Sequence, residues 1–290
     1  MMRRGLAIVL LVCGALTTTV AMVTPAGAAA HGARTVTVLS FNIHHGEGTD
    51  GVLDLDRIAK VIRESRADVV GLQEVDRHYS GRSDWADQAG ALARRLGYHA
   101  AFGANIDRDP PEAGRPRIQY GTAILSRYPI VRSTNTYLYR SPDQEQRGLL
   151  HAELDVRGTP VHVYDTHLAA SSRTDRLRQA RQLTELIGDT EPAVLVGDLN
   201  ALPSAAEITT VAEEFTDVWV AAGHGAGGTY PAETPDRRID YVFTGTGVRP
   251  VWARVIDADP AASDHLPLAA RLVVEPPRDL RGARLAAYRT

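Results

Sequence analysis

Two hydrophobic periodicities run along this chain, one with the two-residue repeat of strands and one with the spacing of helices. Short runs rich in β-branched residues and leucine, bounded by Gly, Pro, Asn or Asp, predict strands. The expected strands cover residues 35–43, 67–75, 98–102, 122–125, 149–156, 161–166, 193–199, 215–220, 238–243, 248–256 and 268–274. Strands interleaved with helices, together with strand pairs joined directly, favour an α/β sandwich with mixed sheets over an all-parallel barrel.

Apolar residues at helical spacing predict three longer helices and a short one. The longer helices are expected over residues 53–65, 84–96 and 173–187, and the short one from residue 204. Asp50 and Asp54 are candidate N-caps of the first helix, because their side chains can accept from free backbone N–H groups. Gly97 and Gly188 are candidate ends of the second and third helices.

Residues 34–275 are expected to form one domain. The 290 residues are 44% hydrophobic, which is enough for a large core, and no linker-like stretch divides the sequence. Two stretches rich in Pro, Gly or Arg, 105–119 and 223–235, are expected to be functional loops. Residues 276–290 form a basic tail that we expect to be a solvated end, with a membrane or polyanion contact as the alternative.

The N-terminal segment has the pattern of an export signal. Arg3 and Arg4 precede an apolar run that continues to about Val23, and a small-x-small cleavage pattern follows. We therefore expect residues 1–28 to be a cleaved signal peptide and the protein to be secreted; a retained N-terminal membrane anchor is the alternative. The one cysteine, Cys13, lies in this segment, so the secreted chain would have no disulfide and would be stabilised by its core.

The charge balance gives little support to nucleic-acid binding. The chain has 32 basic and 35 acidic residues, a formal net charge of -3 that becomes -5 without Arg3 and Arg4. Proteins that bind nucleic acid normally present a basic surface, and no concentrated basic face is visible in the sequence.

Polar side chains follow several of the predicted strands. The apolar strand that begins at Ala193 ends in Asp198, and Asn200 lies two residues further on. On an extended backbone these two side chains share a face and could hold and polarise a water molecule; an Asp/Asn turn is the alternative. The other strand ends with polar side chains carry Asn42, Glu74, His167, Asp240 and the pair Asp264–His265. Each has an ordinary structural role by itself, but α/β folds place their sites at such an edge, so together they predict one site.

Short motifs around these residues resemble those of a known family. They are LSFNI (39–43), LQEVD (72–76), YGTAILSRYPI (120–130), THL (166–168), GDLNA (197–201), RIDYVF (238–243) and SDHLPL (263–268). In this order they are similar to the endonuclease/exonuclease/phosphatase (DNase I-like) superfamily, which includes nucleases, neutral sphingomyelinases and inositol polyphosphate 5-phosphatases. The resemblance implies a four-layer α/β sandwich of two central mixed sheets flanked by helices, here in a secreted bacterial member.

The resemblance also implies a cation and phosphate contacts. Glu74 would be the main protein ligand of Mg²⁺, with Asn42 and Asp264 near it, and Mn²⁺ or Ca²⁺ are alternatives. Oxygen ligands and retained waters are what such hard cations prefer. Arg147, just before the strand LLHAEL, would contact the substrate phosphate. Arg77, which follows LQEVD, is a second candidate for that role, with a surface charge as the alternative.

The remaining motif residues receive catalytic roles from the same resemblance. Asp198 would orient and deprotonate the attacking water, and Asn200 would hold a phosphoryl oxygen. His265, oriented by Asp240, would bind the phosphate or act as acid and base. His167 would donate a hydrogen bond or a proton to the phosphate or the leaving oxygen. In-line attack of water on a phosphodiester needs a base on one side and an acid or metal on the other.

Two departures from the family pattern bear on the substrate. Abasic-site endonucleases carry tyrosine at the position of His167, so base-excision repair is disfavoured. The run NIHHGEG from Asn42 resembles uncharacterised bacterial members and a domain of a eukaryotic protein of glycosylphosphatidylinositol remodelling. This favours lipid or inositol head groups. Because adjacent strand residues point to opposite faces, we expect at most one of His44 and His45 to face the site.

The predicted function is therefore hydrolysis of a phosphodiester in phospholipid or inositol-phosphate head groups by a secreted, metal-dependent enzyme. One alternative is an extracellular nuclease whose groove is formed by Arg108, Arg115, Arg117 and Arg147. A second alternative is a non-catalytic phosphate-binding module, which the full set of acid, base and ligand residues argues against. We expect a monomer with no obligate protein partner and with a peripheral membrane contact as an option.

Overall fold

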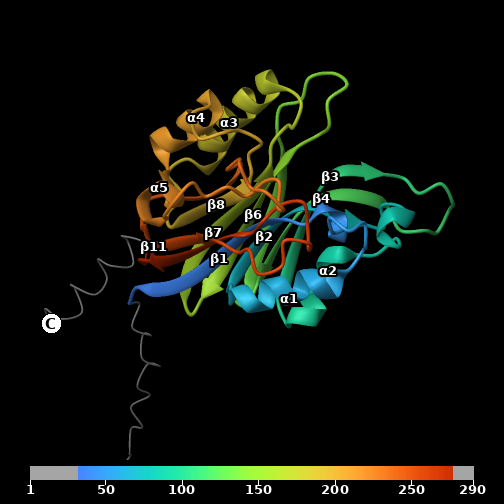
Figure 1. The fold of residues 1–290 in the computed structure, drawn as a ribbon, viewed down its shortest axis with the longest axis horizontal. Coiled ribbons are helices and arrows are strands. Elements are labelled where there is room, and N and C mark those ends of the chain that lie inside the picture. The colour runs from blue at the N-terminus through green and yellow to red at the C-terminus, as the bar shows by residue number, and fades with distance from the viewer. Residues whose placement is uncertain (1–31, 277–290) are drawn as a thin grey trace, which may run out of the picture. The chain divides into compact units, whose positions relative to one another are not determined.

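Two six-stranded sheets packed face to face, with helices on their outer faces, form the domain in this computed structural model (Figure 1). The structure describes residues 32–276. The predicted signal peptide and residues 277–290 of the basic tail lie outside the described residues. Within 32–276 no helix is long and apolar enough to cross a membrane. This arrangement confirms the expected four-layer α/β sandwich.

The first sheet has the strand order β11-β12-β1-β2-β4-β3. Its strands, in chain order, are β1 (Arg34–Asn42), β2 (Val69–Arg77), β3 (His99–Arg108), β4 (Ile118–Ser126), β11 (Val248–Val255) and β12 (Leu268–Val274). β1 and β2 are parallel, whereas the other neighbours in this sheet are antiparallel. The sheet is therefore mixed, as the direct strand-to-strand connections predicted.

The second sheet has the order β5-β6-β7-β8-β10-β9. Its strands are β5 (Ile130–Tyr137), β6 (Gly148–Val156), β7 (Thr159–His167), β8 (Ala193–Asp198), β9 (Thr216–Asp217) and β10 (Asp240–Thr244). β7 and β8 are parallel, and β10 runs antiparallel to β8 with Asp240 opposite Asp198. The carboxyl ends of β7 and β8 and the start of β10 therefore lie at one edge.

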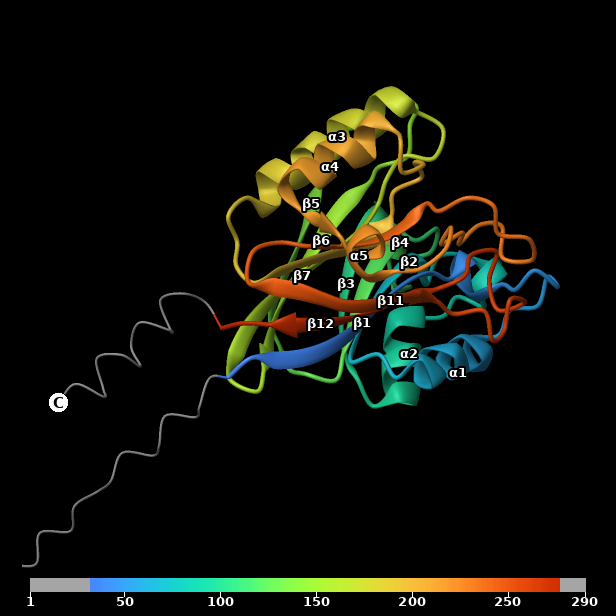
Figure 2. The same cartoon turned by 60° about the vertical axis from the view of Figure 1, so that its left-hand side comes forward.

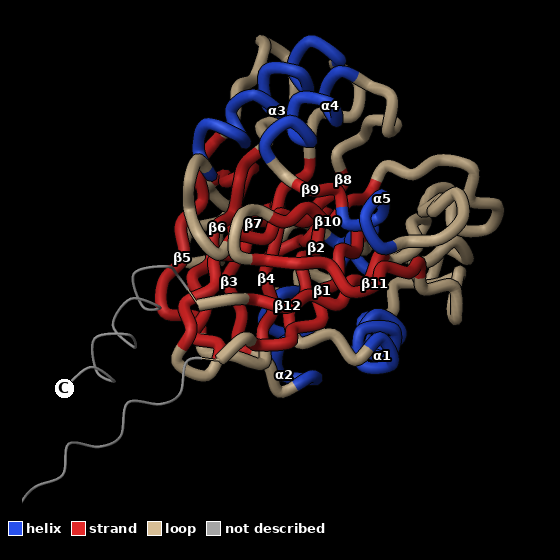
Figure 3. Tube along the Cα trace, turned by 90° about the vertical axis from the view of Figure 1, so that its left-hand side faces the viewer, coloured by secondary structure: helices blue, strands red, loops and turns tan. Residues whose placement is uncertain are grey.

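Helices α1 to α4 cover the two outer faces, and α5 lies at the edge of the sandwich beside β10 and β11 (Figures 2 and 3). The α-helices are α1 (Leu55–Ser65), α2 (Gln88–Leu96), α3 (Arg173–Ile187), α4 (Ala206–Glu214) and α5 (Val218–Ala222), and the 3-10 turns are η1 (His44–Gly46) and η2 (Gly81–Ser83). α1 and α2 share a buried apolar cluster with the first sheet, and α3 and α4 share one with the second. Asp54 caps α1 as predicted, because its carboxylate accepts from the N–H groups of Asp56 and Arg57.

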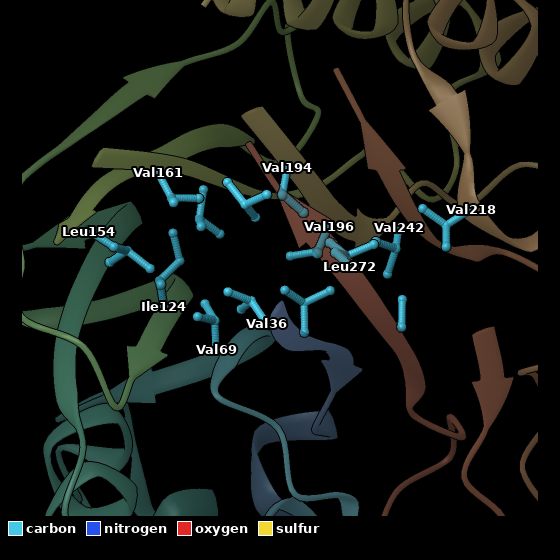
Figure 4. Packing of buried hydrophobic residues seen from close by; sticks show 14 of the residues in the cluster. Val36, Val69, Ile124, Leu154, Val161, Val194, Val196, Val218, Val242 and Leu272 are labelled. Carbon is cyan, nitrogen blue, oxygen red and sulfur yellow. The ribbon is translucent and has the colours of Figure 1, made fainter. Parts of the chain in front are cut away.

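A third apolar cluster fills the space between the sheets (Figure 4). Val36, Val69 and Ile124 of the first sheet face Val161 and Val196 of the second, and all five are at most 3% exposed. Burying a valine or leucine side chain contributes about 1.5–3 kcal/mol to stability. This cluster therefore holds the two sheets together and, with them, the strand ends that carry the polar residues.

Polar side chains interrupt this core at one point. Gly71 of β2 lies so close to the second sheet that a Cβ atom would be 2.2 Å from Val196 Cγ2. Beside it, Gln73 donates from Nε2 to Asp165 Oδ1 at 2.6 Å, which links the sheets. Gln73 Oε1 and Asp165 Oδ2 are both buried without a partner. Burial raises the pKa of Asp165 well above its usual range, which favours the protonated form of this carboxyl.

The element predictions were wrong in four places. Residues 215–220 form only the two-residue strand β9 followed by α5, because Asp217 caps a helix through the N–H groups of Trp219 and Val220. The second predicted helix begins at Gln88 rather than at Asp84, since Asp84 and Trp85 adopt φ of 50° and 54°. β5 was missed because it is a mostly exposed strand without hydrophobic alternation. The predicted loop 105–119 is shorter, because β3 and β4 extend into it.

The raised pKa of Asp165 predicts a contribution to stability that depends on pH. A raised folded pKa contributes stability below the unfolded value of about 4, and this contribution is lost as pH rises through the folded pKa. Asp165→Asn keeps an amide that can pair with Gln73 and removes the ionisation. The Tm of the variant relative to wild type is expected to grow between pH 4 and pH 8, by about 2–4 °C for each kcal/mol of ionisation cost avoided.

Calorimetry or circular dichroism across that pH range measures the two curves. Asp189→Asn, at an exposed position, is the matched control and should follow the wild type. If the difference in Tm between Asp165→Asn and wild type is the same at every pH, the pKa of Asp165 is not raised by folding and the interpretation is wrong.

Candidate active site

The polar strand ends of both sheets meet at one edge of the sandwich. Asn42 ends β1, His167 ends β7 and Asp198 ends β8. Asp240 begins β10, opposite Asp198. The loop that holds His265 leads into β12, which pairs with β1 from Ser40 onward. Residues separated by more than two hundred positions in the chain are thereby brought into contact.

Asp198 is the centre of this group. Its Oδ2 atom lies 3.1 Å from Asn42 Nδ2, 3.4 Å from His167 Nε2 and 3.7 Å from His265 Nε2. Its Oδ1 atom accepts from the backbone N–H of Asn200 at 2.9 Å. Burial, followed by the neighbouring charge of Asp240, raises the pKa of Asp198 to about 7. Near neutral pH this carboxylate is therefore available as a proton acceptor.

His265 is held as a cation by the carboxylates around it. Its Nδ1 atom lies 2.9 Å from Asp240 Oδ2. Burial by itself would lower the pKa of His265, but Asp240, Asp198 and Asp264 outweigh it and raise the pKa to about 10. The Tyr230 ring lies 4.7 Å from the imidazole. Nδ1–H therefore donates to Asp240, and Nε2–H is directed at the Asp198 side of the site.

Ser263 connects this loop to the first sheet. Its hydroxyl donates to the carbonyl oxygen of Asn42 at 2.7 Å and accepts from the N–H of His265 at 3.3 Å. Asp264 is half-buried, and its Oδ1 lies 3.4 Å from the same hydroxyl. The loop is therefore fixed against the end of β1, which sets the position of His265.

His167 is neutral, in contrast to His265. Burial, then the charges of Arg147 and His265, lower the pKa of His167 well below its usual value. Asn200 Nδ2 lies 2.9 Å from His167 Nε2 and 3.1 Å from the Leu168 carbonyl oxygen. Because the amide donates both hydrogens, Nε2 accepts and the ring proton is on Nδ1. Asn200 can bind a phosphoryl oxygen through Nδ2 only if one of these two bonds is exchanged.

Glu74 stands beside Asn42 and is turned toward it by a backbone irregularity. The pairing of β2 with β4 shifts between Leu72 and Val75, and Glu74 has φ of 57°. Such a bulge redirects a side chain. Asn42 Nδ2 donates to Glu74 Oε1 at 3.1 Å, which leaves lone pairs on both carboxylate oxygens for a cation. Glu74 has the oxygen donors that the predicted Mg²⁺ prefers, and cation binding by Glu74, Asn42 and Asp264 stays a prediction.

The turn η1 brings both adjacent histidines to Glu74. His44 and His45 have φ of 44° and 45°, a conformation that costs about 1–2 kcal/mol for each non-glycine residue. One ligand atom from each of His44, His45 and Glu74 lies within 4.8 Å of the others. The expectation that at most one histidine faces the site is therefore wrong, because the residues form a turn and not a strand. Among the described residues, Asp198, Asp240 and His265 form a second group of this kind.

The two candidate phosphate-binding arginines have different surroundings. Arg147 is buried, its Nη1 lies 3.0 Å from Glu145 Oε1, and its charge acts on His167. Arg77 lies with Nε 4.0 Å from Asp87 Oδ1 and with its guanidinium over the Phe102 ring. Arg147 is thus placed at the site, whereas the contacts of Arg77 lie with the start of α2 and with β3. Phosphate binding by either arginine stays a prediction.

Comparison with known proteins agrees with this geometry. The model of the endonuclease/exonuclease/phosphatase family matches residues 39–265, which span the polar strand ends from β1 to His265. The chain belongs to this family. Members of the family are hydrolases that act on phosphoester bonds. The two groups of His and acidic residues above are the places among the described residues where a divalent metal, common in the family, could bind.

Three relatives show how far the likeness extends. The uncharacterized protein YbhP of Escherichia coli K12 is 29% identical over 253 residues, which cover 81% of this chain and 95% of that protein. Protein cwh43 of Schizosaccharomyces pombe is 32% identical over 161 residues, 54% of this chain but 15% of that protein. The crystal structure of a family member from Beutenbergia cavernae has a TM-score of 0.75 and 32% identity, covering 83% of this chain and 72% of that one.

Several residues at the site were not singled out from the sequence. Tyr120 is buried, and burial followed by the charge of Glu74 raises its pKa well above the usual value. Thr229 Oγ1 accepts from the N–H of Asp240 at 3.4 Å, and Tyr230 packs on His265. Tyr120 is the first residue of the motif YGTAILSRYPI (120–130), which is one of the motifs similar to the family. Thr229, Tyr230 and Ser263 have no sequence pattern that separates them from ordinary loop residues.

The opposite charge states of the two histidines can be measured directly. In the metal-free protein, His265 is expected to stay an imidazolium up to about pH 10, while His167 stays neutral. Asp240→Asn should lower the pKa of His265, because one negative charge and one charged acceptor are lost. Long-range ¹H–¹⁵N NMR spectra of the imidazoles report both states. A titration of His265 between pH 6 and 7 in the wild type would contradict the assignment.

Proposed function

We propose that this chain hydrolyses a phosphodiester by attack of water on phosphorus, with the help of a divalent cation, in phospholipid or inositol-phosphate head groups. The observation that carries the proposal is the convergence on Asp198 Oδ2 of His265, which is charged and held by Asp240, of neutral His167 and of Asn42. We also propose that the protein is secreted and acts as a monomer, from the pattern of residues 1–28 and the absence of any evident partner motif.

The cation would be held by Glu74, with Asn42 and Asp264 near it. When bound, it would neutralise the negative charge of the phosphoryl oxygens and polarise the attacking water. Oxygen donors favour Mg²⁺, and Mn²⁺ or Ca²⁺ are also compatible with them. Asn42 orients the Glu74 carboxylate through its hydrogen bond to Oε1.

The chain's own residues supply the proton transfer and the charge. Asp198, with a pKa of about 7, accepts a proton from water as the oxygen–phosphorus bond forms. The two hydrogen bonds from Asn42 and Asn200 fix the carboxylate for this step. His265 places a positive charge beside the phosphoryl oxygens, where negative charge accumulates in the transition state. The leaving oxygen departs as the old P–O bond breaks; the predicted donation to it from His167 requires the other tautomer, with the ring proton on Nε2 rather than on the buried Nδ1.

The arginines of the proposed nucleic-acid groove are mostly neutralised by carboxylates. Arg115 pairs with Glu112 at 3.2 Å, and Arg117 pairs with both Asp107 and Asp109. The other two are Arg147, which pairs with Glu145, and Arg108, which hydrogen-bonds the hydroxyl of Tyr79. Binding of nucleic acid depends on unpaired cations that replace counterions on the phosphates. This supports a head-group substrate over the nuclease alternative.

A mostly apolar cavity beside η2 also supports a lipid substrate. It has a volume of about 330 Å³ and is lined by His78, Trp85, Pro110, Pro111, Glu112, Arg115, Pro116 and Ile118. Trp85 is 51% exposed. The cavity is lined by residues on either side of η2, and η2 contacts η1. A large exposed aromatic residue beside prolines is suited to contact an apolar chain or a membrane surface.

Loss of the proton acceptor or of the charged histidine should abolish the reaction. Asp198→Asn and His265→Gln are each expected to lower kcat/KM on bis-p-nitrophenyl phosphate by about 100-fold or more, equivalent to about 3 kcal/mol. Asp189→Asn and His99→Gln make the same chemical changes at exposed positions and should keep wild-type activity. Circular dichroism checks the fold of each variant. Full activity in either site variant would refute the mechanism.

A substrate panel separates the head-group proposal from the nuclease alternative. Sphingomyelin, phosphatidylinositol, inositol phosphates, plasmid DNA and RNA are incubated with the protein in Mg²⁺ and in EDTA. We expect cleavage of at least one lipid or inositol substrate in Mg²⁺ and none in EDTA, because the phosphoryl charge is then not neutralised. Cleavage of DNA or RNA alone would overturn the head-group proposal, and undiminished cleavage in EDTA would overturn the role of the cation.

A further inference from the structure

His44 and His45 have the surroundings of metal-bound histidines. His44 Nδ1 lies 3.2 Å from the carbonyl oxygen of Glu47, so this nitrogen carries the proton and Nε2 has a free lone pair. His45 Nε2 lies 3.5 Å from the carboxylate of the same Glu47. Histidines that bind a metal through one nitrogen typically donate from the other to a carbonyl or a carboxylate. The carbonyl oxygen of Glu47 is such an acceptor for His44, and its carboxylate lies at ion-pair distance from His45.

The other nitrogen of His45 has no partner inside the protein. His45 is 7% exposed, and its Nδ1 atom is buried without a hydrogen bond. Buried polar atoms in native proteins are almost always paired, so an unpaired one requires a specific cause. A ligand atom of this imidazole lies within 4.8 Å of those of His44 and Glu74. A cation bound between the three side chains through Nδ1 of His45 would supply the missing partner.

The backbone around the two histidines is held in place although its conformation is unfavourable. The N–H of His44 donates to Asn42 Oδ1 at 3.1 Å, and Gln88 Nε2 donates to the carbonyl oxygen of His45 at 2.5 Å. The carbonyl of Gly46 accepts from the N–H of Asp54 at 2.9 Å. Left-handed residues of this kind persist where the surroundings impose them, and they cluster at functional sites. The imidazoles are therefore positioned before any ligand binds.

The local charge is compatible with a cation. Arg82 is close enough to lower the pKa of His45, together with burial, which is the larger cause. Its guanidinium is, however, paired with Asp76 through two hydrogen bonds of 2.8 and 2.7 Å. The positive charge on this side is thus compensated, and Glu74 adds a negative charge to the group.

We propose that His44, His45 and Glu74 bind one divalent transition-metal cation, such as Co²⁺ or Zn²⁺, in preference to Mg²⁺. Imidazole nitrogens suit these metals, whereas Mg²⁺ favours oxygen ligands and retained water. The inference rests on the proposed function, because it names the class of cation for the centre that Glu74 serves there. It adds two nitrogen ligands that the predicted set of Asn42, Glu74 and Asp264 does not contain.

Calorimetric titration of the EDTA-treated full chain with Co²⁺ and with Mg²⁺ tests the proposal, and the visible absorption of bound Co²⁺ reports nitrogen ligation. We expect tighter binding of Co²⁺ than of Mg²⁺. His44→Gln and His45→Gln should each weaken Co²⁺ binding by roughly 10–100-fold or more and change its spectrum, with a small effect on Mg²⁺. Glu74→Gln should weaken both cations.

Two further variants separate this site from Co²⁺ binding by histidines elsewhere in the chain. His99→Gln removes an exposed histidine where β3 pairs with the last residue of β4, and should bind Co²⁺ as the wild type does. His151 Nε2 and His162 Nδ1 lie 3.0 Å apart on the second sheet and could bind Co²⁺ by themselves. The titrations are therefore repeated in a His151→Gln/His162→Gln background, where the Glu74-dependent site should remain.

The outcomes distinguish this inference from the proposed function. If Co²⁺ affinity and spectrum are unchanged in both His44→Gln and His45→Gln, the histidine site is refuted, while phosphodiester cleavage in Mg²⁺ would still support the function. If Co²⁺ binds through the histidines but no phosphoester in the panel is cleaved with any cation, the metal site stands and the proposed function fails.

Discussion

One side-chain amide, that of Asn42, joins the two halves of the site. Its Nδ2 donates to Glu74 of the first sheet and to Asp198 of the second, each at 3.1 Å. Its Oδ1 accepts from the N–H of His44, and Asn42 is fully buried at the end of β1. The proposed cation side and the proposed proton-transfer side therefore share one rigid connection. Its position depends on how closely the two sheets pack, which in turn requires Gly71 to have no side chain.

The buried charges of Asp198, Asp240 and His265 stabilise one another. Asp198 and Asp240 are almost fully buried, and His265 is the buried cation between them. Buried carboxylates are unfavourable unless they are paired and hydrogen-bonded. The same surroundings make one histidine positive and the other neutral, and they give Asp198 a pKa between those of a usual carboxylate and of His265. Groups whose environments move their pKa values apart are suited to separate acid and base roles.

Strained backbone conformations at the site occur at the residues whose side chains are proposed to function. His44, His45, Glu74 and Asn200 all have positive φ, although none is glycine. Hydrogen bonds from other segments hold these turns, such as Gln88 to the carbonyl of His45 and the amide of Asn200 to Leu168. A less constrained backbone would relax at these positions. The site geometry is thus maintained by the packed sandwich and is not a property of the turns themselves.

Local sequence patterns determined much of this architecture. The helix Arg173–Ile187 and the strand Leu268–Val274 match their predicted bounds, because a long apolar periodicity or a mostly apolar strand is encoded within one segment. The strand ends that carry polar side chains also lie at one edge, as expected. Parallel strands, and antiparallel strands that are directly connected, leave their ends at a shared edge of the sheet. Local patterns did not predict the edge strand β5 or the short helix α5. An exposed strand such as β5 lacks hydrophobic alternation. In α5, the N-cap Asp217 favours a helix although the sequence resembles a strand.

Tertiary structure alone decided the finer chemistry. No periodicity reveals that η1 directs both histidines to Glu74, that Arg77 lies against Asp87, or that Asp165 pairs with Gln73 across the sheets. Contacts of this kind join residues far apart in the chain, and their geometry depends on the packing of whole layers. Protonation states likewise depend on burial and on charges from other segments. The sequence by itself therefore determined which residues gather at the edge, and the fold decided which of them touch and which of them are charged.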